Sequence, residues 1–186
     1  FMANFLTELD VDRAHLVGHS MGAAIASKVA LDCPDRVASL TLIGSAGLGE
    51  EINNDYTDRF AQAESRRDMK SVLQMLFTDP GLVSRQLVDD VLKYKRMDGV
   101  SSLLTELGSA VFGGGVQQER PGLELAASDA VPPTLVIWGR EDAIIPASHA
   151  DNFPAAAVTV FDEVGHMAQM ERASDVNQLI LSHLNG

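Results

Sequence analysis

The sequence is poor in cysteine and in basic residues, and it has no long apolar run. Cys33 is the one cysteine among 186 residues, so neither an internal disulfide nor a cysteine-rich metal site can form, as is typical of a reducing compartment such as the cytoplasm. Lys and Arg number 14 against 26 Asp and Glu, and the formal net charge of -12 disfavours binding to nucleic acid or to anionic membrane surfaces. No apolar run approaches the ~20 residues that cross a bilayer. No basic region precedes the first apolar residues, as a signal peptide would require.

An apolar fraction of 46% is normal for a protein with a packed core, and the length fits one domain, alone or with a large insertion. Short β-branched runs predict buried strands over 13–19, 37–44, 134–138 and 157–161. Helical spacing or composition predicts helices over 1–9, 20–32, 147–152 and 174–184, the last with Ser174 as its N-cap. Strands that alternate with helices are typical of a parallel α/β sheet.

Residues 48–127 differ from the rest of the chain. They carry many charges, apolar residues at helical spacing and a run of three glycines at 113–115. This pattern predicts several short amphipathic helices. We therefore expect a helical cap inserted between two parts of one core, which comprise residues 1–47 and 128–186.

The stretch HLVGHSMGAA holds the clearest chemical signal. Ser20 lies between Gly18 and Gly22, after a predicted buried strand and before an Ala-rich helix. A sharp strand-to-helix turn would expose the serine, and the two glycines would remove side chains that collide as strand and helix close together. The N–H of Met21, at the start of the helix, would then stabilise an oxyanion. The alternative is a plain tight turn in which Ser20 caps the helix.

A serine nucleophile needs a base and an acid, and both candidates follow later strands. Asp142 comes just after the strand over 134–138, and His166 comes just after the strand over 157–161. Because parallel strands end at one edge of a sheet, we expect both side chains near Ser20. His166 would accept the serine proton and Asp142 would orient the imidazole. The alternatives are that Glu141 is the acid, that Asp142 caps a helix, and that His166 is a buried core histidine.

The other candidates carry weaker signals. His19 could line the pocket or pack in the turn, whereas His15, His149, His183 and Cys33 read as surface or packing residues. The histidines stand apart, without the spacing of metal ligands, so no metal is predicted. The basic pairs Arg66-Arg67 and Lys95-Arg96 could meet phosphates or a carboxylate, although solvated helix faces explain them as well.

The motifs LVGHSMG, WGREDAIIP and EVGHMAQME resemble, in order, the nucleophile, acid and histidine motifs of the α/β-hydrolase family. The segments LGEEIN, 65–100 and the tail resemble the C-terminal hydrolase-like domain of acetoin dehydrogenase dihydrolipoamide acetyltransferases, in which a lipoyl domain precedes this domain. The resemblance implies serine-dependent acyl transfer or hydrolysis on a small ester or thioester, with coenzyme A or a lipoyl arm as co-substrate and no bound cofactor. The alternatives are a free-standing esterase or C–C bond hydrolase, and a non-catalytic docking domain of a dehydrogenase complex.

The motif order departs from the family pattern in one respect. The family places several strands and a His-Gly loop before the elbow, whereas here the elbow is at residue 20. We therefore expect a parallel half-sheet of four strands with the elbow strand at an exposed edge. The expected explanation is a piece of a longer protein, or a fold that a second chain completes. Met21 N–H is then the one oxyanion donor that the sequence names.

Overall fold

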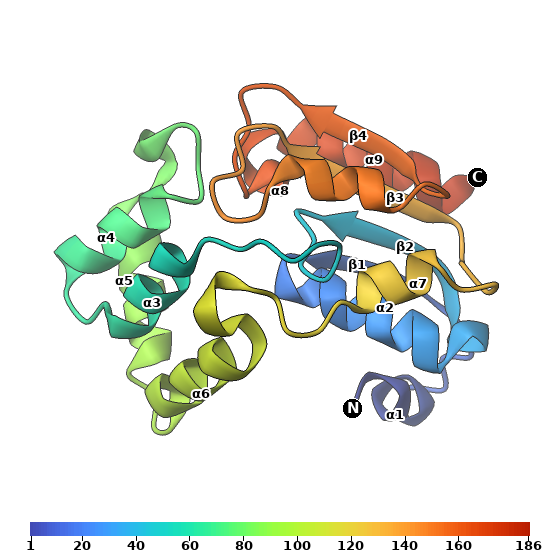
Figure 1. The fold of residues 1–186 in the computed structure, drawn as a ribbon, viewed down its shortest axis with the longest axis horizontal. Helices are drawn as coiled ribbons and strands as arrows, with labels where there is room; N and C mark the ends of the chain where they lie inside the picture. Colours follow the sequence, from blue (N-terminus) through green and yellow to red (C-terminus); the bar gives the residue numbers. More distant parts are fainter.

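The computed structural model describes all of residues 1–186 (Figure 1). Four parallel strands form one sheet in the order of the chain: β1 (Ala14–His19), β2 (Val37–Ile43), β3 (Thr134–Gly139) and β4 (Ala157–Phe161). None of the four strands contains a charged residue. The predicted half-sheet and its exposed edge are confirmed, because β1 pairs only with β2 and Val17 remains 51% exposed.

The alternation of side chains along the strands divides the core between the two faces of the sheet. Leu40, Leu42 and Trp138 join a large cluster with α2 (Met21–Asp32). Ile43 and Ile137 join a small cluster with α9 (Ala173–Asn185) on the opposite face. Two layers of helix therefore enclose the sheet, and its strands all end at the edge that carries the candidate residues (Figure 1).

Most of the segment over 48–127 forms a separate group of helices beside the sheet, away from both chain ends (Figure 1). These helices are α3 (Asn54–Gln62), α4 (Arg66–Gln74), α5 (Arg85–Lys95) and α6 (Val100–Phe112). A 3₁₀ turn over Pro80–Leu82 separates α4 from α5, and another over Gly113–Gly115 follows α6. Helix α7 (Pro121–Ala126) lies against α2 instead, within the core. We refer to α3–α6 as the cap.

The remaining elements match the predictions with two exceptions. Helix α1 (Met2–Glu8) begins the chain, and a 3₁₀ turn over Pro34–Arg36 follows α2. The predicted helix over 147–152 is a 3₁₀ helix (Ala147–Asn152), and α8 (Ala168–Glu171) precedes α9. The N-cap assignment to Ser174 is wrong. Arg172 ends α8 and is itself the N-cap of α9, which begins at Ala173, so Ser174 already lies inside the first turn. None of the helices combines the length and the apolar character that a membrane span requires.

Candidate active site

The turn between β1 and α2 is a strained elbow. Ser20 has φ 53° and ψ −121°, a backbone conformation that costs an ordinary residue free energy and that neighbouring contacts must enforce. Two of these contacts are backbone hydrogen bonds to the next strand and its loop: Ser20 N–H donates to Ile43 O at 2.9 Å, and Ala46 N–H donates to Ser20 O at 3.1 Å. The Ser20 side chain makes no capping hydrogen bond to α2, so the capping alternative has no support.

The two glycines of the elbow have different roles. A Cβ on Gly18 would lie 2.5 Å from Gly22 O and 2.6 Å from the backbone of Ala23, so strand and helix can approach only because position 18 has no side chain. A Cβ on Gly22 would meet nothing within 4 Å. The prediction that both glycines clear the closure of the turn is therefore right for Gly18 and wrong for Gly22 within this chain.

Asp142 and His166 form a buried pair. His166 Nδ1 lies 2.7 Å from Asp142 Oδ2, and the two side chains are 3% and 0% exposed. Three further donors hold the carboxylate: Trp138 Nε1–H donates to Oδ2 at 3.0 Å, and the N–H groups of Ile144 and Ile145 donate to Oδ1 at 2.8 and 3.0 Å. All four acceptor positions are thus filled, which fixes the carboxylate in place. Because Asp142 engages Nδ1, the nitrogen left to accept a proton is Nε2.

Glu141, the alternative acid, bonds to neither residue of this pair. Its side chain is exposed, and its Oε2 accepts a hydrogen bond from Val164 N–H at 3.1 Å. Glu141 therefore braces the loop before His166. The same two loops touch at Gly139, where any Cβ would overlap the carbonyl oxygens of Val164 and Gly165. The loop geometry thus favours Asp142 over Glu141 as the partner of His166.

His19 supports the histidine in a way that sequence spacing did not reveal. Its Nε2–H donates to the His166 carbonyl at 2.9 Å, and the two rings lie 4.7 Å apart between centroids. Burial, reinforced by the neighbouring His166, lowers the pKa of His19 to about 4. His19 is therefore neutral at pH 7 and adds no charge that would oppose protonation of His166.

The cap also holds the histidine loop. His166 N–H donates to Leu76 O at 2.9 Å. Glu171 joins the two segments, because its Oε1 accepts from Gly165 N–H at 2.7 Å and its Oε2 accepts from Thr78 N–H at 2.9 Å. The position of His166 thus depends on residues 76–78, which follow α4 in the cap. No periodic pattern in the sequence marks this clamp.

Two of the remaining histidines and one residue of each basic pair have structural partners. His149 packs edge-on against Trp138, and its Nε2 lies 2.7 Å from Glu51 Oε2, where the cap begins. Of the basic residues, Arg66 bonds Asp89 at 2.5 and 3.3 Å. Lys95 donates to three carbonyls at the end of α3, those of Phe60, Ala61 and Ala63. His15 bonds Ser39, and Cys33 is partly buried with a free thiol.

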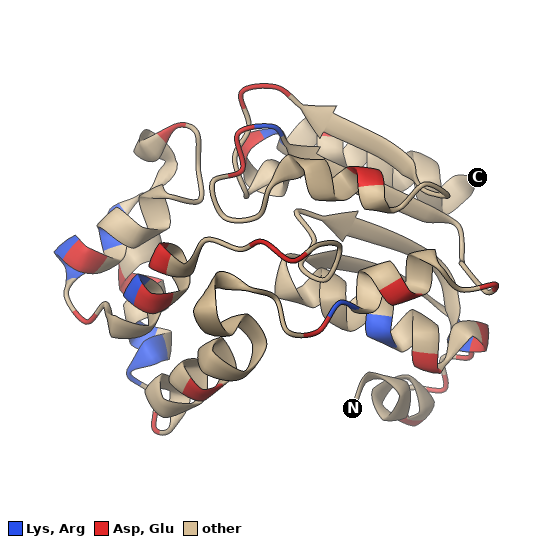
Figure 2. Ribbon diagram, viewed as in Figure 1, with Lys and Arg blue, Asp and Glu red and all other residues tan.

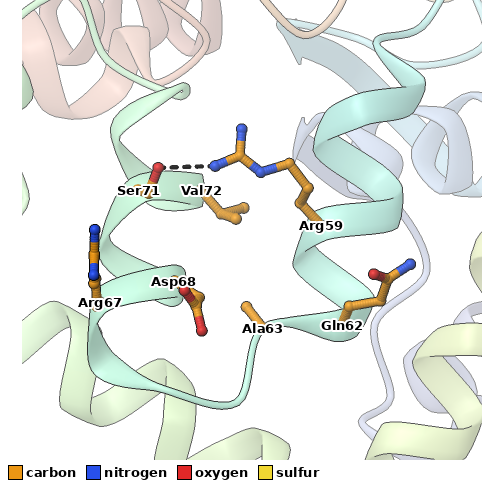
Figure 3. Close-up of a pocket in the computed structure, with 7 residues that line it drawn as sticks. All are labelled: Arg59, Gln62, Ala63, Arg67, Asp68, Ser71 and Val72. Atoms are coloured by element: carbon orange, nitrogen blue, oxygen red, sulfur yellow. Dashed lines mark hydrogen bonds between the residues drawn. The ribbon is translucent and has the colours of Figure 1, made fainter.

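Arg67 lies at a cavity within the cap, between α3 and α4 (Figure 3). The cavity has a volume of about 360 Å³. Arg59 also lines it and donates to Ser71 Oγ at 2.8 Å and to Asp55 at 3.1 Å. Asp68 lines the same cavity, so carboxylates balance its two guanidinium groups. This balance favours solvated helix faces over a phosphate site. No group of three or more His, Cys, Asp or Glu side chains gathers to hold a metal ion.

The comparisons with known proteins identify the family and the fold. A model of the alpha/beta hydrolase fold matches residues 1–173. The chain belongs to the alpha/beta hydrolase family. A meta-cleavage product hydrolase from Pseudomonas fluorescens superposes with a TM-score of 0.85 over 99% of this chain and 69% of that one, at 23% identity, and so shares the fold.

Two curated relatives are more similar in sequence. The dihydrolipoyllysine-residue acetyltransferase component of the acetoin cleaving system of Cupriavidus necator is 50% identical over 187 residues, which cover 100% of this chain and 50% of the relative. The protein with the same description from Pseudomonas putida is 49% identical over 96% of this chain and 47% of its own length. The chain therefore spans about half the length of these relatives. The resemblance to this group that the cap and tail segments suggested is confirmed.

Proposed function

We propose that the protein transfers or hydrolyses acyl groups with Ser20 as nucleophile, His166 as general base and acid, and Asp142 as the group that orients His166. The observation that carries the proposal is the buried Asp142–His166 pair at 2.7 Å, joined through His19 to the elbow that holds Ser20 at φ 53°. In the first step the Ser20 oxygen attacks the acyl carbon, and its proton moves to His166 Nε2. Met21 N–H would stabilise the oxyanion that forms.

The second half of the reaction reverses these roles. The tetrahedral adduct collapses, the thiolate or alkoxide departs, and it takes the proton from His166. The incoming thiol or water then loses a proton to His166 and attacks the acyl-serine, which releases the product and restores Ser20. Asp142 stabilises the imidazolium during both halves without becoming protonated.

The relatives favour acetyl transfer as the reaction. Both curated relatives at about 50% identity are described as acetyltransferase components of an acetoin cleaving system. We therefore propose a thioester substrate, with a dihydrolipoyl arm as donor and coenzyme A as acceptor. We also propose that the protein assembles with other subunits of such a system, because each of these relatives is described as a component.

Two further functions remain as alternatives. A C–C bond or ester hydrolase is one, since a 2-hydroxy-6-oxo-6-phenylhexa-2,4-dienoate hydrolase from Burkholderia cepacia is 31% identical over 95% of this chain. A non-catalytic docking domain is the other, and the large helical insertion over 48–127 is the observation in its favour. Co-purification with a dehydrogenase complex that tolerates Ser20→Ala, with no turnover of any ester or thioester, would support docking alone.

A fluorophosphonate probe tests the proposal. We expect the full-length protein to be labelled at Ser20, and Ser20→Ala and His166→Ala to be labelled much less. Glu141→Gln is the matched control, because its carboxylate lies next to Asp142 in the chain and does not touch His166. Equal labelling of all the variants would overturn the assignment.

A further inference from the structure

A cavity of about 530 Å³ opens between α2 and α6, beside the elbow. Met21, which follows Ser20, lines it, and so does Ala46, whose N–H binds the Ser20 carbonyl. The volume is in the range of small-molecule sites. Because one residue that adjoins Ser20 and one that bonds its carbonyl form part of the wall, the cavity lies next to the elbow.

The walls of the cavity are apolar on both sides. Ala24 and Ile25 of α2 form one wall, and Leu107, Val111 and Phe112 of α6 form the other. Ile25 is 49% exposed and Leu107 is 37% exposed. Helix α6 has only one charged residue, yet none of its residues is buried. Both helices thus turn apolar side chains to a space that no other part of the chain fills. Such a surface is stabilised when an apolar ligand covers it.

The polar residues of the cavity make it acidic. Glu119 and Glu124 are two of its lining residues, and Lys28 is its one basic residue. The Lys28 ammonium lies 2.6 Å from the Asp32 carboxylate, which offsets its charge. Acidic and basic segments near α2 and α7 are visible in Figure 2, whereas α6 is almost uncharged. Carboxylates without free cations repel an anionic chain and tolerate a neutral one.

We infer that this cavity binds the uncharged aliphatic chain of a thioester or ester substrate and discriminates against chains that end in a carboxylate. The inference rests on the proposed role of Ser20, and it names the substrate class of that site. It also separates the protein from hydrolases whose substrates are described as dienoates or dienedioates, as in some of its relatives.

A pair of acetyl thioesters tests the inference in the full-length protein. S-acetyl-6-mercaptohexanamide and S-acetyl-6-mercaptohexanoate differ only in the terminal amide or carboxylate. We expect kcat/KM at least tenfold higher for the amide. Leu107→Trp fills the cavity and should lower kcat/KM for the amide about tenfold, whereas Leu103→Trp should not, since Leu103 is exposed one turn earlier on α6 and outside the lining.

Separate variants test the charge of the cavity. Glu119→Gln and Glu124→Gln should reduce the ratio of kcat/KM between the amide and the carboxylate thioester. Glu106→Gln, on α6 but outside the lining, should leave this ratio unchanged. Equal kcat/KM values for the two thioesters would overturn the inference. The same change in kcat/KM for the amide in Leu107→Trp and Leu103→Trp would overturn it as well.

Labelling and binding distinguish failure of the inference from failure of the proposed function. If Ser20 reacts with a small methyl fluorophosphonate while the cavity variants have no effect, the inference fails and the nucleophile stands. If Ser20 does not react, the proposed function fails. Calorimetric titration of the amide thioester into Ser20→Ala still tests the cavity in that case, because binding needs no hydroxyl. Binding that Leu107→Trp weakens tenfold supports the cavity, and binding that it leaves unchanged overturns it.

Discussion

Asp142→Asn gives the most detailed prediction, because all four hydrogen bonds of the carboxylate are defined. An asparagine has a single acceptor oxygen, so its NH₂ group must face either the two backbone donors on Oδ1 or the side-chain donors on Oδ2. The less costly orientation keeps the bonds from Ile144 and Ile145. The NH₂ group then opposes Trp138 Nε1–H and His166 Nδ1–H.

The loss of these bonds sets the size of the effect. Hydrogen bonds to a charged group contribute about 1.5–3 kcal/mol each, and one of the two can be recovered if His166 changes tautomer and accepts from the amide. We therefore expect Asp142→Asn to lower the free energy of unfolding by about 3 kcal/mol. For a chain of this length that corresponds to a decrease in Tm of about 6–12 °C.

The change of tautomer has a second consequence. A proton moved to His166 Nε2 occupies the nitrogen that must accept the proton of Ser20. A comparable substitution in a serine protease lowers kcat about 10⁴-fold for this reason. Activity should therefore be lost at temperatures where the variant is still folded.

Thermal unfolding followed by circular dichroism measures the effect on stability. Glu141→Gln is the control, since its side chain is exposed and the amide oxygen can still accept from Val164 N–H. We expect its Tm to change by less than about 2 °C. If Asp142→Asn and Glu141→Gln had the same Tm, the four-donor arrangement around Asp142 would be wrong.

Three further predictions concern the supports of the site. The pKa of His19 falls to about 4 in the folded state, below its ordinary 6.5, so the free energy of unfolding should be highest above pH 6.5 and decrease by about 3 kcal/mol towards pH 4. In His19→Gln, the free energy of unfolding measured with urea should depend less on pH over this range. An unchanged pH dependence would argue against the neutral histidine. Glu171→Gln removes one of the two acceptor oxygens that join Gly165 to Thr78. We expect a lower kcat with little change in KM, together with faster hydrogen exchange at the Thr78 amide. Exchange at the wild-type rate would show that Glu171 does not hold these two segments together. Lys95→Met leaves the carbonyls at the end of α3 without their donor. We expect limited proteolysis to cut the cap faster in this variant while the sheet stays protected. Equally faster cleavage of cap and sheet would contradict a local role.

The sheet and the acid–histidine pair could be predicted because both follow from local patterns. Short β-branched runs separated by helices identify parallel strands, and the carboxyl ends of parallel strands lie at one edge. Asp142 and His166 each follow such a strand, so their contact needs no knowledge of the cap. Gly18 could be predicted in the same way, because the close approach of strand and helix at an elbow is a local constraint.

The supports of the site could not be predicted, because they join residues far apart in the sequence. His19 bonds a residue 147 positions away, and Glu171 bonds Thr78 across 93 positions. Neither contact leaves a periodic signal. The role of Gly22 was overestimated for a related reason, since the motif describes a glycine at that position without saying what a side chain there would meet.

The cap illustrates the same limit. Helical spacing indicates amphipathic helices over 48–127, but it does not say which of them leave the core. Helix α7 packs on α2, whereas α6 stands apart from it across the cavity. The basic pairs were ambiguous in sequence because their partners lie on other helices, with Asp89 on α5 for Arg66 and the end of α3 for Lys95.

The central claim is that Ser20 carries the acyl group during turnover. The most direct measurement is peptide mass mapping after the full-length protein is mixed with S-acetyl-6-mercaptohexanamide and quenched with acid. We expect one acetyl group on the peptide that contains Ser20, absent from Ser20→Ala and strongly reduced in His166→Ala. An acetyl group on another residue, or thioester turnover that Ser20→Ala leaves intact, would contradict it.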